Sequence, residues 1–379
     1  MKNLMKGMII FFSVVLVGLI GLLTFALVTG SERLPLIGSI SEGFYESKLI
    51  NTETVSLEDI SAIDIDNSSY DIVFKRGESE EIVIKEYGKS KDKTFVTAEK
   101  SGKTLSIKSN KNIGRTWFVI VSTYRYYEVY LPESYNGSMD IETSSGDIYA
   151  ETNLTFSDFK VDSTSGYVEL LKLSAANIDI QTSSGDVEAD YLDGDAKISC
   201  TSGYVEVGDI AGNAKIETSS GDIDAGQVKG TVEISSQSGY VYVAKSGGDT
   251  KIETSSGDVN IKNITGKLNI KTSSGYVEAD DIAGGGTIDT NSGDVNIEFT
   301  ALTDDLDIQT SSGYVSCEIP QNTQFQFEAN TSNGDIDTDF DKQLSFNKKG
   351  NQVSGLIGDS ADYQVTIKTS SGDIDVSYR

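Results

Sequence analysis

Along most of the chain, small or β-branched residues alternate with polar ones around a recurring glycine turn. Between residues 141 and 376 the sequence repeats "I-x-T-S-S-G-D-[IV]" and a sister version, "T-S-G-Y-V". Counted from the glycine, positions −5, −3, +2 and +4 are small or apolar, and polar residues separate them. This two-residue period predicts strands with one buried face. The fold class is therefore expected to be all-β.

The spacing of the turns indicates how these strands are arranged. The turn glycines follow one another every 18 residues through the middle of the chain, and at slightly longer intervals towards the ends. A unit this short cannot bury its own apolar face, whereas stacked units can. We therefore predict a parallel β-solenoid of about 18–20 residues per coil, with equivalent strands stacked about 4.8 Å apart.

The regular repeat divides the chain into parts. We expect residues 53–135 to form a wider N-terminal part of the solenoid, with Trp117 in its core. Residues 136–319 carry the regular array. Residues 320–379 are expected to form C-terminal coils and a closing hairpin, because an open sheet edge invites aggregation. We expect the alternation to continue there, since Leu356 follows Gly355 where a tyrosine would be due.

Residues 8–28 form an uncharged apolar stretch of 21 positions, which is long enough to span a membrane as a helix. Lys2 and Lys6 precede it, so the positive-inside tendency places residues 1–7 in the cytoplasm. We predict a single-pass cell-membrane protein with a linker at 29–52 and an extracytoplasmic C-terminal domain. A cleaved signal peptide remains the alternative, although its apolar region would be shorter.

The composition of the chain excludes several kinds of partner and catalytic site. The chain has 58 acidic and 31 basic residues, a formal net charge of -27, which argues against nucleic acid as a partner. It has no histidine, so histidine-based catalysis and histidine-ligated metals are excluded. Cys200 and Cys317 occupy inward positions and are expected to be core residues. No catalytic residue, metal site or cofactor is predicted, while weak calcium binding stays open.

The residue after the turn glycine alternates between aspartate and tyrosine. A column of aspartates about 4.8 Å apart would repel, and interposed tyrosines double the distance between charges. The alternation is thus either a stable way to build a corner or an extended binding face, since tyrosine strips suit glycan and peptide contacts. The candidate binding residues are Tyr167, Tyr204, Tyr240, Tyr276 and Tyr314, with Asp186, Asp222 and Asp258 between them.

An enzyme is the competing hypothesis, because parallel β-helices often act on polysaccharides. An inverting glycosidase needs two carboxylates about 6.5–9.5 Å apart, and aspartates two coils apart come near that distance. The array nevertheless offers many equivalent pairs and no unique one, and no copy of the repeat is broken. We therefore favour a non-enzymatic binding or scaffold module, with a polysaccharide-active β-helix enzyme as the alternative.

The N-terminal apolar segment, the "YEVYLP" strand and the repeated "I-x-T-S-S-G-D-[IV]" together resemble the bacterial putative-adhesin family. This family includes LiaG-like envelope proteins and belongs to the wider group of Toastrack domains. The resemblance covers roughly residues 53–379. It implies a right-handed β-solenoid outside the membrane, near envelope-stress signalling systems, with an adhesion or assembly role. The expected partners are the membrane, through the N-terminal helix, and an unidentified envelope protein or glycan.

Overall fold

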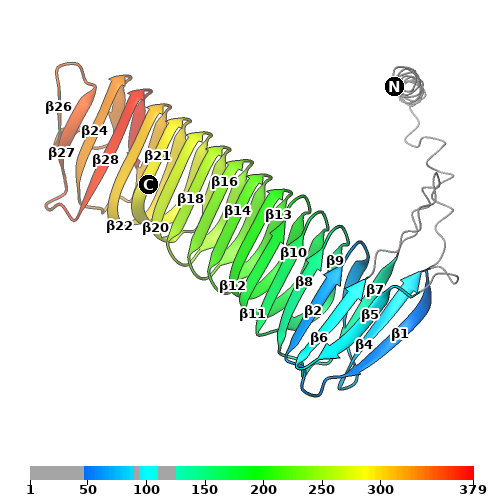
Figure 1. Ribbon diagram of the computed structural model, residues 1–379. Helices are drawn as coiled ribbons and strands as arrows, with labels where there is room; N and C mark the ends of the chain where they lie inside the picture. Colours follow the sequence, from blue (N-terminus) through cyan, green and yellow to red (C-terminus); the bar gives the residue numbers. More distant parts are fainter. Residues whose placement is uncertain (1–46, 89–93, 110–124) are drawn as a thin grey trace, which may run out of the picture.

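The computed structural model describes residues 47–88, 94–109 and 125–379. They form an elongated rod of stacked coils, with the blue N-terminal strands at one end and the red and orange C-terminal strands at the other (Figure 1). The prediction of an all-β parallel solenoid is confirmed. Within the described ranges the helical structure is confined to one short 3-10 turn, η2 (Asp341–Gln343).

Two parallel ladders run along the rod and meet at the glycine corner. The ladder before the corner follows this order: β6 (Thr104–Ser109), β2 (Ala62–Asn67), β8 (Ser138–Thr143), β10 (Asp158–Ser163), β11 (Val168–Thr182), β12 (Val187–Ser202), β14 (Ala214–Ser220), β16 (Val232–Ser238), β18 (Thr250–Ser256), β20 (Thr265–Ser274), β21 (Val277–Ser292), β22 (Val295–Ser312), β28 (Tyr363–Ser371) and β24 (Phe325–Asn333).

The ladder after the corner contains the second strand of each coil. Its order is β7 (Tyr126–Leu131), β3 (Asp71–Arg76), β9 (Ile148–Thr155), β11, β12, β13 (Val205–Ile210), β15 (Ile223–Val228), β17 (Val241–Ser246), β19 (Val259–Lys262), β21, β22, β23 (Val315–Ile319), β29 (Ile374–Tyr378) and β25 (Ile336–Thr338). Strands β11, β12, β21 and β22 belong to both ladders because each continues through the far corner of its coil.

The core lies between the two ladders, where the repeat predicted it. In the coil that contains Gly221, Ile216, Ile223 and Ala225 are all buried. Cys200 and Cys317 are buried and unpaired, which confirms them as core residues. Each coil thus supplies a thin apolar slice, and the parallel main-chain hydrogen bonds join the slices into one core.

At both ends the coils are not stacked in chain order. The β2–β3 coil lies between the β6–β7 coil and the β8–β9 coil. Likewise the C-terminal β28–β29 coil lies between the β22–β23 coil and the β24–β25 coil. In Figure 1 the red β28 is seen beside the orange β24. The order of the coils in space therefore differs from their order along the chain at both ends.

Antiparallel strands cover the two end coils. At the N-terminal end β4 (Glu81–Gly88) pairs with β7, β1 (Lys48–Ser56) pairs with β4, and β5 (Val96–Ser101) pairs with β6. At the other end β27 (Gln352–Ile357) pairs with β24, and β26 (Leu344–Phe346) pairs with β27. Strands β26 and β27 form an antiparallel hairpin at this end of the rod. Because Gly355 and Leu356 lie in antiparallel β27, the corner alternation does not extend to them, contrary to the expectation from the sequence.

Two expectations concern residues outside the described ranges: the membrane anchor at 8–28 and the core position of Trp117. In the described ranges no helix has the length and apolar character that a membrane span requires. Strand β1 begins at Lys48, within the stretch expected to be a linker.

Replacing Ile216 by alanine should destabilise the protein by about 2–5 kcal/mol, because the side chain is fully buried and its loss leaves a cavity. The adjacent Glu217 faces solvent and pairs with Lys215 at 3.1 Å. Glu217→Gln should change the stability by less than about 0.5 kcal/mol. Denaturant unfolding of the two variants checks this contrast, and similar losses in both would contradict the assigned register.

Ending the chain after residue 358 should remove an inner coil rather than a peripheral one. Strands β22 and β24 would both lose their parallel neighbour β28. We expect the main-chain amides of β24 to lose their protection from hydrogen exchange, while those of β14 in the middle of the rod keep it. Full protection of β24 in the shortened chain would show that the end coils stack in chain order.

Candidate functional site

The corner between the two ladders depends on a column of glycines in close contact. A Cβ atom added to Gly221 would lie 1.9 Å from the carbonyl oxygen of Gly203 in the neighbouring coil. The same approach recurs from Gly372 to Gly313 at 2.0 Å and from Gly334 to Gly372 at 2.1 Å, which independently gives the stacking order at the C-terminal end. No side chain fits at this position, so the corner requires glycine.

The aspartates after these glycines bind the main chain of the next coil. The Tyr240 amide donates a hydrogen bond of 2.7 Å to Asp222 Oδ1, and the Tyr204 amide donates one of 2.7 Å to Asp186 Oδ1. The pattern holds for Asp147, Asp258 and Asp294, at 2.8–2.9 Å. It also holds where two aspartates are neighbours: the Asp335 amide donates to Asp373. An aspartate at this position therefore acts as a cap on the coil above it.

The tyrosines form a separate row on the outside of the corner. Tyr204, Tyr240, Tyr276 and Tyr314 are 37–42 % exposed, which is high for aromatic side chains. They lie two coils apart, so their repeat is roughly 10 Å. We call the five tyrosines, from Tyr167 to Tyr314, the tyrosine row. The structure thus brings the predicted residues together along one edge of the rod.

Two hydroxyl groups of the row, those of Tyr167 and Tyr314, donate to carboxylates that stand two residues after the corner position of the next coil. Tyr167 donates to Glu188 in the next coil, and Tyr314 donates to Asp375 at 3.3 Å. Partial burial, together with nearby Asp224 and Glu206, raises the pKa of Tyr204 to about 12. The hydroxyl groups therefore stay protonated near neutral pH and act as donors. The surface is an aromatic row flanked by acidic residues.

The far corner of the coils carries a second set of caps, which the sequence analysis missed. Eight residues before the corner glycine, Asp195 Oδ1 accepts from the Asn213 amide at 2.8 Å, and Asn213 Oδ1 accepts from the Thr231 amide at 2.9 Å. Asp249 and Asp305 do the same further along the rod. The available signal was the recurrence of Asp or Asn eight residues before the glycine.

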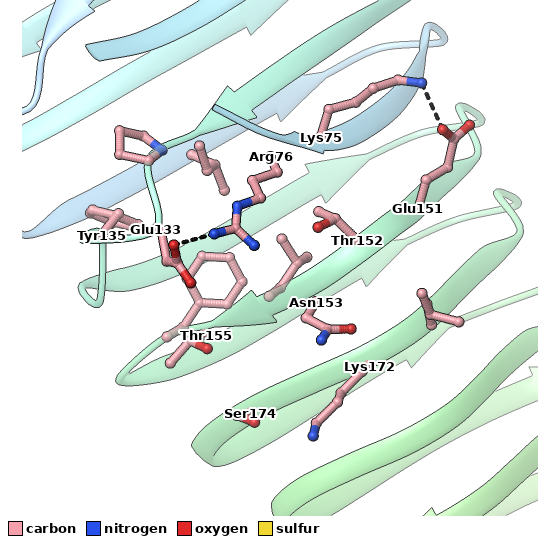
Figure 2. Close-up of a pocket in the computed structure, with 15 residues that line it drawn as sticks. Lys75, Arg76, Glu133, Tyr135, Glu151, Thr152, Asn153, Thr155, Lys172 and Ser174 are labelled. Atoms are coloured by element: carbon pink, nitrogen blue, oxygen red, sulfur yellow. Dashed lines mark hydrogen bonds and ion pairs between the residues drawn. The ribbon is translucent and has the colours of Figure 1, made fainter. Parts of the chain in front are cut away.

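The repeat is also interrupted, contrary to the expectation that every copy is intact. Between Gly146 and Gly166 the coil has 20 residues, and the pairing of β9 with β11 shifts there. Glu151 and Thr152 together face Leu171, which is the two-against-one arrangement of a β-bulge. A groove of about 470 Å³ lies at this point (Figure 2). The clue in the sequence was the departure from the 18-residue spacing.

The Toastrack DUF4097 family model matches residues 60–247 and 245–377. The chain belongs to this family. The two matched ranges together span nearly all of the described coils, so the Toastrack assignment applies to the whole rod. None of the curated proteins matches the chain.

Three solved structures show similarity to this Toastrack chain. One is described as a putative cell adhesion protein from Clostridium sporogenes ATCC 15579, with 9 % identity, a TM-score of 0.23, and coverage of 88 % of this chain and 100 % of that one. A putative adhesin from Bacteroides fragilis NCTC 9343 has 11 % identity, a TM-score of 0.29, and coverage of 87 % and 97 %. A putative adhesin from Parabacteroides merdae ATCC 43184 has 12 % identity, a TM-score of 0.25, and coverage of 70 % and 95 %. With such low scores, the family assignment rests on the family model.

Replacing Asp222 by alanine should destabilise the rod by about 1 kcal/mol, because the Tyr240 amide loses its acceptor. Asp222→Asn keeps an oxygen at the same place and should lose less than half as much. Urea unfolding of both variants measures the difference. If asparagine were as harmful as alanine, the negative charge rather than the cap would be the stabilising feature.

Proposed function

We propose that this Toastrack chain is a membrane-anchored, extracytoplasmic module of the cell envelope that binds or organises other envelope components without catalysis. The observation that carries the proposal is the tyrosine row, which presents exposed rings at a constant interval along a rod. Each ring offers apolar area and a hydroxyl donor, a combination that suits glycan and peptide contacts. Repeated weak contacts along the row would add up to strong attachment.

The anchor gives the rod a direction. The uncharged segment at 8–28 precedes the described residues, and β1 lies at one end of the rod (Figure 1). In the proposed arrangement this end faces the membrane, and the tyrosine row extends away from it into the envelope. The resemblance to LiaG-like proteins adds a link to envelope-stress signalling. Two of the structures named above are described as putative adhesins and one as a putative cell adhesion protein, and these names are compatible with attachment.

The polysaccharide-enzyme alternative receives no support from the corner. Asp186, Asp222 and Asp258 each use one carboxylate oxygen to hold a main-chain amide, as a structural cap does. Their environments repeat from coil to coil, whereas acid–base catalysis needs two carboxylates with different environments. A binding face, by contrast, gains from repetition.

The test replaces all five tyrosines of the row by serine in the full-length chain. Crosslinking in intact cells, and co-sedimentation with isolated envelope glycan, would measure what the protein captures. We expect capture to fall at least tenfold, because several ring contacts are lost together. The rings lie outside the core, so the variant should remain folded by circular dichroism.

The matched control replaces Asp186, Asp222 and Asp258 by asparagine. It keeps the caps and the rings but removes three charges from the same edge. Unchanged capture in this control together with lost capture in the serine variant supports ring contacts. If the folded serine variant captured as much as the wild type, the row would be architecture alone.

A further inference from the structure

The groove at the β-bulge gathers positive charge on a strongly acidic protein. Lys75 and Arg76 from β3 and Lys172 from β11 line it, in a chain whose formal net charge is -27. Figure 2 shows the Arg76 side chain over the middle of the groove, with Asn153 and Lys172 below it. Leu154, Leu171 and Phe156 are among the apolar lining residues. The site thus combines three cations, the two carboxylates of Glu133 and Glu151, small polar groups and apolar surface.

The three cationic side chains differ in the strength of their contacts within the protein. Lys75 is tied to Glu151 at 2.6 Å and lies 3.7 Å from Glu128. Arg76 pairs with Glu133, and both side chains are largely exposed, so this pair contributes little to stability and can be exchanged. Lys172 lies over the ring of Tyr191, 4.9 Å from its centre, and forms no ion pair with any residue in the described ranges. Arg76 and Lys172 are therefore available to a ligand.

The groove also holds uncharged polar groups. The side chains of Asn153 and Thr155 line the groove, and neither forms a hydrogen bond within the part of the chain that the structure describes. Both come from β9, next to the bulge, where the chain departs from the 18-residue coil. Leu171, which lies in the bulge, is 46 % exposed and gives the groove an apolar wall.

We propose that this groove binds the anionic group of an acidic saccharide, a carboxylate or a phosphate ester, between Arg76 and Lys172. The Arg76 guanidinium supplies paired donors, Lys172 supplies a second positive charge, and Asn153 and Thr155 hydrogen-bond the remaining oxygens. The sugar ring lies against the exposed side chain of Leu171. The site is separate from the tyrosine row and does not depend on the function proposed for that row.

The two cations point to a test by titration of the full-length chain with three probes: glucuronate, glucose 6-phosphate and glucose. Calorimetry should show saturable binding of an anionic probe and at least tenfold weaker binding of glucose. A preference for glucuronate or for glucose 6-phosphate identifies the anionic group as carboxylate or phosphate. Equal binding of glucose, or no binding of either anion, would overturn the proposal.

Variants with matched charge changes locate the binding. Lys172→Gln should weaken anion binding about tenfold through loss of a charge-assisted contact. Lys215→Gln removes the same charge from β14, where Lys215 pairs with Glu217 and Glu233, and should leave binding unchanged. If the two variants weakened binding equally, the effect would be one of net charge and the groove would not be the site.

A further variant is expected to strengthen anion binding rather than weaken it. Glu133→Gln removes the carboxylate that competes for Arg76, so anion binding should tighten several-fold. Glu217→Gln makes the same charge change in the middle of the rod and should not tighten it. The five-serine variant of the tyrosine row should bind the anionic probe normally, so failure of one proposal can be told apart from failure of the other.

Discussion

The whole rod depends on the close contact of glycine with glycine at the corner. With the oxygen of Gly203 only 1.9 Å from where a Cβ of Gly221 would be, two successive coils reach hydrogen-bonding distance only if this position has no side chain. The contact fixes the register of both ladders, since each residue then lies over its equivalent in the next coil. A side chain at a given position of the repeat recurs in coil after coil, so its contribution to the stability recurs as well.

Acidic residues have a structural role in this architecture that is easily mistaken for surface decoration. At the glycine corner an aspartate accepts the amide of the next coil, and at the far corner Asp195, Asn213 and Asp249 do so as well. Corners are where ladders lose their regular partners, so each corner needs an acceptor from a short side chain. Part of the net charge of -27 therefore arises from caps. The tyrosine of the neighbouring coil donates its main-chain amide to the aspartate. Its ring stays free to face outward.

Much of the fold was predictable because the inward positions are specified locally. Ile216 and Cys200 could be placed in the core from their distance to the next glycine alone. The order of the end coils could not be predicted, because "IKTSSGDIDV" near residue 370 fits equally well at any level of the stack. The strand pairings and the contacts of Gly372 with its neighbours decide it. The aspartate caps were missed because a repulsion between charges accounted for the alternation equally well. The groove was missed because the effect of two extra residues appears only when strands of unequal length pair.

The inserted C-terminal coil has a consequence for how the protein is made. Residues 363–379 are synthesised after the β22–β23 and β24–β25 coils, yet they fill the space between them. The middle of the rod can assemble coil by coil during synthesis, as each new strand finds its predecessor already in place. The outermost coil cannot, because β24 has no partner on its inner side until β28 has been made. Synthesis of β28 and β29 is thus the event that completes the stack at this end, and a chain that stops before them keeps an open sheet edge at β24.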